Sequence, residues 1–260
     1  MGLTPVGSTQ TTVKYHTSPV RPDILHACDI GEEIGIGYGF NNIPMVYPTT
    51  STIGAFIPEN KFTDLLRHEV AQAGYTECLT FSLTSIEDSY YGLLSKEEVE
   101  QVRSQPGKGE GVMVENEKSK DFEMVRTSLA PGLLKVLQSN QDERIPQKIF
   151  EINDVCKLDS TTDTGARNER KVCVMQLNST ASFEVIHGVL GLVMSKVGAE
   201  MGKDYYLKES NQKQNPQYFE KRGADVMLRG SKIGSIGVLH PEVIGAFGLK
   251  NPVSVVELDF

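Results

Sequence analysis

Residues 59–83 read ENKFTDLLRHEVAQAGYTECLTFSL, and this stretch decides the fold of the main domain. Its first part predicts an amphipathic helix from Glu59 to about Ala73, because apolar residues recur there at three- and four-residue steps. Gly74 ends the helix, and Tyr75 to Leu83 follows as a predicted strand. The apolar stripe of the helix consists of Phe62, Leu65, Leu66 and Val70.

Strand and helix patterns continue toward the C-terminus. Helices are predicted from Ser182 to Val197 and from His240 to Phe247. Because helices bunch between strands that are joined by hairpin-like turns, the pattern favours an α+β fold with an antiparallel sheet. A doubly wound parallel sheet is the alternative. The predicted strands are Lys148 to Val155, Lys171 to Leu177, Tyr205 to Lys208, a pair around Gly230-Ser231, and Pro252 to Phe260.

The segment between the opening strand and Lys148 carries helix-start signals. Two capping boxes, Thr84 to Glu87 and Ser95 to Glu98, predict short helices, and a strand is expected at Val112 to Glu115. Thr127 or Ser128 is expected to cap a further helix that has Pro131 in its first turn. Backbone amides at such a start can bind an anion, but a plain cap is the favoured interpretation.

The N-terminal part differs in composition from the main domain. It begins with a Thr-, Ser- and Gly-rich segment, and a helix is predicted from Asp23 to about Tyr38 after Pro22. Three prolines and a Thr/Ser cluster then indicate an extended linker. The predicted division is a loose leader at 1–13, a small unit at 14–43, a linker at 44–58 and the main domain at 59–260.

Charge and cysteine usage narrow the class of protein. The chain of 260 residues carries 26 Lys and Arg against 34 Asp and Glu, so its formal charge is −8. That sign is wrong for a chain whose main work is neutralising nucleic-acid phosphates, so any contact with tRNA or DNA is expected to be local or shared with a partner. The four cysteines have no zinc-site spacing, and no signal peptide or 18-residue apolar run occurs. We therefore expect a cytoplasmic protein that makes no membrane contact.

Carboxylates gather on the N-terminal helix. Asp29 shares a helical face with Glu32 and Glu33 through i+3 and i+4 spacing, and Asp23 lies six residues before Asp29, about 9 Å away along a regular helix. Converging carboxylates suit a hard cation such as Mg²⁺. Charge runs are more often a solvated face, so spacing alone favours the solvated face and leaves the cation site open.

The residues resemble a known family, the β subunit of phenylalanyl-tRNA synthetase of the eukaryotic or archaeal type. The longest matching run is RPDILHACDIGEEI at 21–34 with GYGFNNI at 37–43. Because the family's β subunit extends further at its N-terminus, where it carries an editing domain, the resemblance implies a C-terminal portion of it. A fragment, a split gene product and a degenerate copy all stay open. Further blocks in the same order are LRH at 66–68, GYTE at 74–77, LTFSL at 79–83, VRTSLAPGLL at 125–134, KIFEI at 148–152, FEVIHG at 183–188 and GVLHPEV at 237–243.

The resemblance implies a metal site in the small unit. In the family, an Asp/Asp/Glu/Glu pattern forms a magnesium site that the α subunit completes. Residue by residue, the pattern falls on Asp23, Asp29, Glu32 and Glu33. The implied cofactor is therefore Mg²⁺ shared with an α subunit, and segment 14–43 is expected to be a partial magnesium-ligand domain.

The main domain is similar to a class II synthetase catalytic fold, which is catalytically silent in the family's β subunit. The predicted strand from Lys148 to Val155 is followed by Cys156-Lys157-Leu158-Asp159, where class II enzymes lead into an arginine that neutralises the ATP α-phosphate. The resemblance therefore implies that an α subunit uses ATP and attaches phenylalanine to tRNA(Phe). It also implies a subunit interface at 59–83, with Phe62, Leu65 and Leu66. The alternative is a stand-alone interaction module that kept the fold.

Overall fold

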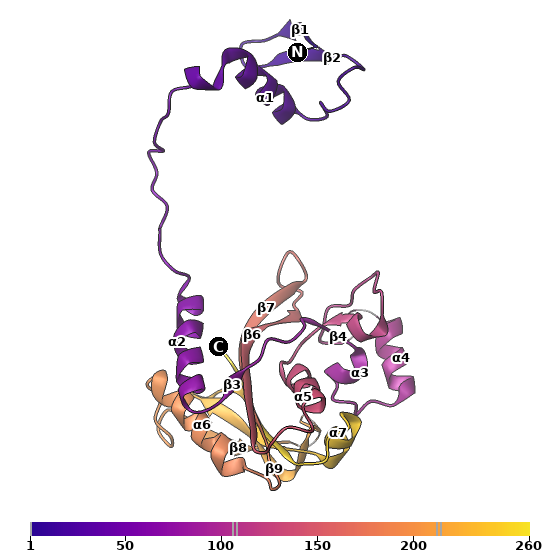
Figure 1. The fold of residues 1–260 in the computed structure, drawn as a ribbon, viewed down its shortest axis with the longest axis vertical. Coiled ribbons are helices and arrows are strands. Elements are labelled where there is room, and N and C mark those ends of the chain that lie inside the picture. The colour runs from indigo at the N-terminus through magenta and orange to yellow at the C-terminus, as the bar shows by residue number, and fades with distance from the viewer. Residues whose placement is uncertain (1, 106, 108, 212, 214) are drawn as a thin grey trace. The chain divides into compact units, whose positions relative to one another are not determined.

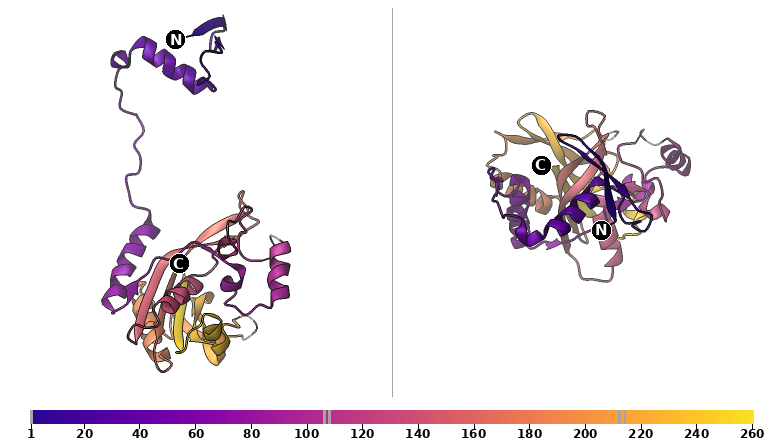
Figure 2. Two further views of the ribbon diagram at one scale, coloured as in Figure 1. Left: turned by 45° about the vertical axis from the view of Figure 1, so that its right-hand side comes forward. Right: turned by 90° about the horizontal axis from the view of Figure 1, so that it is seen from above.

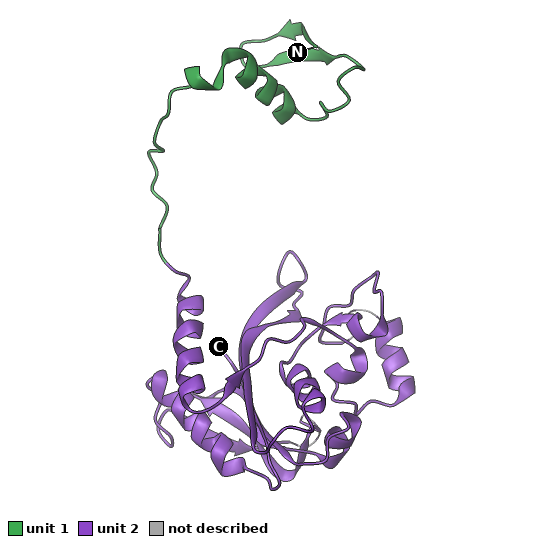
Figure 3. Cartoon of the chain, in the orientation of Figure 1, with its two compact units in different colours: residues 1–55 green, residues 56–260 purple. Residues whose placement is uncertain are grey.

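The computed structural model describes residues 2–105, 107, 109–211, 213 and 215–260. The chain divides into two compact units, 1–55 and 56–260, drawn in green and purple in Figure 3. Each unit is described by itself. The predicted linker at 44–58 lies at the end of unit 1 and the start of unit 2, and its bounds stay a prediction.

Unit 1 opens with a hairpin, which corrects the expected loose leader at 1–13. Strand β1 (Leu3–Ser8) pairs antiparallel with β2 (Val13–Thr17). The physical reason is the turn between them, where Thr9 Oγ1 lies 2.6 Å from Thr12 Oγ1 and the nitrogen of Thr9 donates to the carbonyl of Thr12 at 2.7 Å. Met1 lies outside the described residues.

The helix of unit 1, α1 (Ala27–Tyr38), begins later than predicted from the sequence. His26 is its N-cap, and the nitrogen of His26 donates to the side chain of Asp29 in a capping box. Asp23 therefore lies before the helix and not on it. None of the residues of α1 is buried, and a short 3₁₀ helix, Phe40–Asn42, follows.

The centre of unit 2 is a seven-stranded sheet (Figure 1). Every neighbouring pair is antiparallel except β3 with β6, which run parallel. The α+β expectation is confirmed, and the doubly wound parallel alternative is wrong. The sheet is mixed because a long segment with three helices separates β3 from β6, which leaves room for a parallel crossover. In spatial order the strands are β3 (Thr76–Glu77), β6 (Gln147–Leu158), β7 (Ala166–Leu177), β11 (Val253–Asp259), β10 (Ser231–Leu239), β9 (Tyr218–Leu228) and β8 (Tyr205–Glu209).

Helices cover both faces of this sheet. On one face lie α2 (Pro58–Gln72) and α6 (Phe183–Lys196), and on the other α5 (Ala130–Ser139) and α7 (Pro241–Ala246). Figure 2 shows the sheet between these helices, with the yellow C-terminal strand inside it. The strands alternate as a pleated sheet requires, so each face of the sheet supplies one half of the core. In β7, Val172 and Val174 pack with α2 and α6, whereas Cys173 and Met175 pack with α5 and α7.

A smaller cluster lies between β3 and α5 in sequence. The single strand predicted from Tyr75 to Leu83 is instead β3 and the separate strand β4 (Leu83–Thr84), which pairs with β5 (Met124–Val125). The strand considered at Val112 to Glu115 is reduced to one bridge, from Met113 to Met124. The cluster also contains α3 (Ile86–Ser89), α4 (Lys96–Ser104) and the 3₁₀ helix Lys120–Phe122.

Candidate functional site

Two of the four acids predicted to bind metal point at an arginine. Arg21 Nη2 lies 2.6 Å from Asp23 Oδ2 and 2.6 Å from Glu33 Oε1, and its Nε donates to Asp23 Oδ1 at 2.9 Å. The hydrogen bonds from Arg21 hold the pKa of both carboxyl groups below its ordinary value. Asp23 and Glu33 are therefore brought together by a protein cation.

The other two acids have different surroundings. Asp29 Oδ2 accepts hydrogen bonds from the nitrogens of His26 at 2.7 Å and Leu25 at 2.9 Å. These backbone donors lower the pKa of Asp29. Glu32 is exposed on α1. Among the described residues, no group of three or more His, Cys, Asp and Glu side chains is placed to hold a metal ion.

The acids as placed do not fit a magnesium ion as one set. Mg²⁺ demands near-octahedral oxygen ligands at about 2.1 Å, and a guanidinium on two of the carboxylates repels such an ion. The third carboxylate, on Asp29, is engaged in capping α1. The magnesium assignment for these acids stays a prediction.

The predicted interface residues on α2 separate into three environments. Leu65 is 61 % exposed, whereas Leu66 is 2 % exposed and packs in the core of unit 2. Phe62 is half-buried, with its ring centroid 5.2 Å from that of Phe260 in an edge-to-face contact. Leu66 packs toward the sheet, because one helical stripe must face it, and its assignment to an interface stays a prediction. The interface roles of Phe62 and Leu65 stay predictions.

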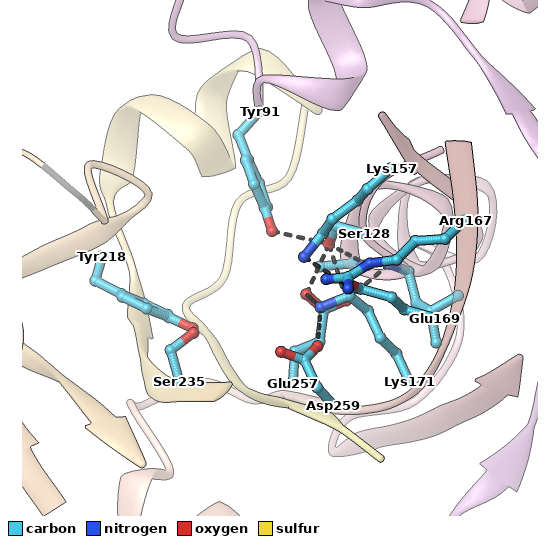
Figure 4. Close-up of polar contacts among 12 residues, drawn as sticks. Tyr91, Ser128, Lys157, Arg167, Glu169, Lys171, Tyr218, Ser235, Glu257 and Asp259 are labelled. Atoms are coloured by element: carbon cyan, nitrogen blue, oxygen red, sulfur yellow. Dashed lines mark hydrogen bonds and ion pairs between the residues drawn. The ribbon is translucent and has the colours of Figure 1, made fainter. Parts of the chain in front are cut away.

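Unit 2 contains a polar cavity of about 460 Å³ on the sheet face that carries α5 and α7. Its floor comes from alternate positions of the strands, such as Lys171 on β7 and Glu257 and Asp259 on β11. Tyr91 and Ser128 reach it from the segment before α5, as Figure 4 shows. Polar positions inside otherwise apolar strands thus meet above the middle of the sheet.

A hydrogen-bonded group of residues lies at the centre of this cavity. Glu257 Oε1 accepts from Ser128 Oγ at 2.9 Å and from the nitrogen of Leu129 at 2.7 Å, and Ser128 Oγ is 3.1 Å from the hydroxyl of Tyr91. Lys171 Nζ pairs with Asp259 and lies 3.9 Å from Glu257 Oε2. Burial lowers the pKa of Lys171, but these two carboxylates outweigh it, and its pKa lies above the ordinary value.

The lysines that line the polar cavity are all paired with carboxylates of the chain. Lys157 Nζ lies 2.8 Å from Glu169 Oε2, and Lys232 Nζ lies 2.7 Å from Asp225 Oδ1. Within the described part of the chain, the cavity therefore offers no lysine whose charge is left for an anion.

Comparison with known proteins decides the family. A family model described as the phenylalanyl tRNA synthetase beta chain CLM domain matches residues 43–260. The chain belongs to the phenylalanine–tRNA ligase β-subunit family. It is 45 % identical to a β subunit of this ligase from Drosophila melanogaster over 244 residues, 92 % of this chain and 39 % of the relative. It is 40 % identical to the Homo sapiens β subunit over 250 residues, which cover 95 % of this chain and 40 % of that relative.

The chain spans about two fifths of the length of the curated relatives it matches. For the Caenorhabditis elegans β subunit, the match covers 263 positions at 40 % identity, which is 100 % of this chain and 42 % of the relative. The resemblance to the phenylalanine–tRNA ligase β-subunit family that the sequence motifs predicted is thereby confirmed.

The start of α5 in this member of the β-subunit family differs from the sequence prediction in its cap residue and in the anion it binds. The predicted cap at Thr127 or Ser128 is wrong, because Leu129 is the N-cap residue of α5 and makes no side-chain cap bond. Ser128 Oγ, one residue earlier, accepts from the nitrogen of Ala130 at 3.1 Å. The anion at this helix start is the chain's own Glu257. The sequence signal for it was a charged residue inside the apolar run Val253–Asp259.

Sequence reasoning missed a second polar pair in this β-type chain. Arg126 Nη1 lies 2.8 Å from Glu151 Oε1, and the two side chains are 4 % and 1 % exposed. Arg126 Nε also donates to the carbonyl of Asp154 at 3.1 Å. The pair joins the segment before α5 to β6, so we assign it a structural role.

Proposed function

We propose that this chain is a non-catalytic β-type subunit of phenylalanine–tRNA ligase that supports ATP-dependent attachment of phenylalanine to tRNA(Phe) by an α subunit. The single observation that carries the proposal is the similarity to named β subunits along 92–100 % of the chain. The stand-alone interaction module is not favoured, because the relatives are named as subunits of a ligase.

A class II synthetase-like scaffold is proposed for unit 2. Its support is a sheet whose neighbouring strands are antiparallel apart from the edge strand β3, with helices on both faces. The paired lysines of the polar cavity support the absence of a catalytic role, since adenylate formation needs cations that stabilise developing phosphate charge. ATP is therefore assigned to the α subunit.

We place the α subunit on the surface formed by the stretch 59–83. Leu65 on α2 and two residues after β3, Leu79 at 85 % and Phe81 at 79 %, expose large apolar side chains. Exposed apolar surface of this kind is typical of protein interfaces. Strand β3 is also an edge strand of the sheet.

The remaining partners follow from charge and from the relatives. With a net charge of −8, the chain is proposed to approach tRNA(Phe) only through the complex. Mg²⁺ is proposed as a ligand shared with the α subunit in the assembled complex, because Arg21 engages two of the four acids in this chain alone. A cytoplasmic location is supported by a relative from Arabidopsis thaliana named as cytoplasmic. Among the helices of the described residues, none has the length and hydropathy needed to cross a bilayer.

Co-purification with an α subunit tests the proposal. We expect the two chains to elute together in gel filtration, and aminoacylation of tRNA(Phe) by the α subunit to rise when this chain is added. The chain alone should show no ATP–pyrophosphate exchange. Leu65→Asp with Phe81→Asp should abolish co-elution, whereas Val185→Asp on α6, also exposed, should not. A chain that leaves the α subunit unbound would favour the stand-alone module instead.

A further inference from the structure

We infer that Arg21 is a built-in cation of unit 1, which occupies the carboxylates of Asp23 and Glu33 and excludes a divalent cation from these two residues in the chain alone. The inference starts from the disagreement between the ion that the family implies and the cation found in the structure. It concerns the chain alone, so it holds or fails independently of the proposed partnership with an α subunit.

The contacts of Arg21 engage both carboxylate oxygens of Asp23 and one of Glu33. Its Nε and Nη2 make a two-pronged contact with Asp23 at 2.9 and 2.6 Å, and Nη2 also donates to Glu33 at 2.6 Å. Charge-assisted contacts of this kind are short and directional. A divalent ion bound to the same oxygens would lie within a few ångström of the guanidinium, where like charges repel. Arginine and metal therefore exclude each other at these two residues.

The remaining acids do not offer a substitute site. Asp29 accepts two backbone hydrogen bonds at the start of α1, and moving it would uncap the helix. Glu32 is the one acid of the four that these contacts leave out. A single exposed carboxylate is a weak ligand, since Mg²⁺ sites use several oxygens. Binding of a divalent cation therefore requires that Arg21 withdraw.

The Arg21 contact also has a mechanical role. Glu33 is twelve positions from Arg21, and the ion pair ties the segment before α1 to the second turn of that helix. Because no residue of α1 is buried, such a tie matters more here than in a packed helix. A divalent cation that replaced the guanidinium would restore the same tie through Asp23 and Glu33.

The experiment titrates the full chain with Mn²⁺ and follows free Mn²⁺ by electron paramagnetic resonance, with Mg²⁺ as competitor. Arg21→Gln should bind Mn²⁺ at least about tenfold more tightly than wild type, and Mg²⁺ should displace it. Lys196→Gln is the control, because Lys196 pairs with a single carboxylate, that of Glu69, so its removal frees no pair of acids for a metal. That control should bind as wild type does. Arg21→Gln with Glu33→Gln should lose the gain.

Hydrogen exchange of the α1 amides is a second measurement, which covers the case in which the substitution loosens the helix. If Arg21→Gln loosens α1, Mn²⁺ should restore slow exchange in this variant and have no such effect on wild type. Wild-type binding as tight as that of Arg21→Gln would overturn the inference. The same holds if Arg21→Gln gains neither Mn²⁺ affinity nor metal-dependent protection.

Discussion

Glu257 Oε1 lies 2.7 Å from the backbone nitrogen of Leu129, so the last strand of the sheet supplies the anion at the start of α5. The two residues are far apart in the sequence, and Ser128 Oγ donates to the same carboxylate. Lys171 lies on the other side of the carboxylate. One side chain of β11 thus joins a helix start to the middle of the sheet.

Replacing Glu257 tests this connection. Glu257→Gln leaves the Lys171 charge with one partner fewer and should lower the free energy of unfolding by about 1–3 kcal/mol. Urea denaturation followed by circular dichroism measures the loss. The control is Glu242→Gln, because Glu242 is exposed near the start of α7 and should change stability by less than about 0.5 kcal/mol. Equal effects of the two changes would contradict the role of Glu257.

Breaking the buried ion pair of Arg126 and Glu151 should lower the free energy of unfolding by more than the Glu257 change does. Glu151→Gln leaves a buried guanidinium without its counter-charge and should destabilise unit 2 by about 3–5 kcal/mol. Glu169→Gln is a control of the same chemistry at a more exposed ion pair and should cost about 1 kcal/mol or less. Thermal and urea unfolding both report the difference. A cost for Glu151→Gln no greater than for Glu169→Gln would show that the pair is not essential to the fold.

The backbone at Gly234 on β10 leaves no room for a side chain, so a substitution there should destabilise the sheet. A Cβ atom at this position would lie 2.1 Å from the carbonyl oxygen of Glu257 on the neighbouring strand, a distance that real side chains do not reach. Gly234→Ala should therefore lower stability by about 1–3 kcal/mol through displacement of the strand pair. Gly245 in α7 is the control, since a Cβ there meets no atom within 4 Å. Gly245→Ala should be neutral or stabilising in the same urea titration.

The order and type of the main elements could be predicted from the sequence because they have local signals. Short apolar runs in β7 and β11 and the helical period of α6 mark these elements by themselves. Strand β1 of unit 1 was missed, since it contains Pro5 and Gly7 and lacks an apolar alternation. The polar cavity was missed for another reason. Its central contact joins Ser128 to Glu257, and no local pattern encodes a pairing over that separation.

The acidic group illustrates the same limit at a candidate site. Spacing identified Asp29 and Glu33 as neighbours on one helical face, as they are on α1. It did not reveal that Arg21, from the preceding segment, donates to Glu33. Nor did it reveal that Asp29 accepts from the nitrogen of His26. Partners outside the helix, and backbone groups at its end, therefore determine what each carboxylate does.

A pH dependence follows from the surroundings of Glu123. Burial alone would raise the pKa of this carboxyl group, but Arg103 at 2.9 Å and the nitrogen of Ile86 at 3.0 Å outweigh it, and the pKa lies below the ordinary value of 4.5. A pKa that is lower in the folded than in the unfolded state contributes stability above about pH 4.5. That contribution is lost as the pH falls through the lower, folded-state pKa.

Unfolding free energies between pH 7 and pH 3 test this dependence. Wild type should lose stability below about pH 4.5, and Glu123→Gln should be less stable at pH 7 by about 3 kcal/mol, with a flatter profile in the acid range. Glu100→Gln is the matched control, because Glu100 also pairs with Arg103, at 2.6 Å, but is 68 % exposed. It should follow the wild-type curve closely. If both variants follow the wild-type curve, Glu123 contributes nothing to the acid sensitivity, and another carboxylate must account for it.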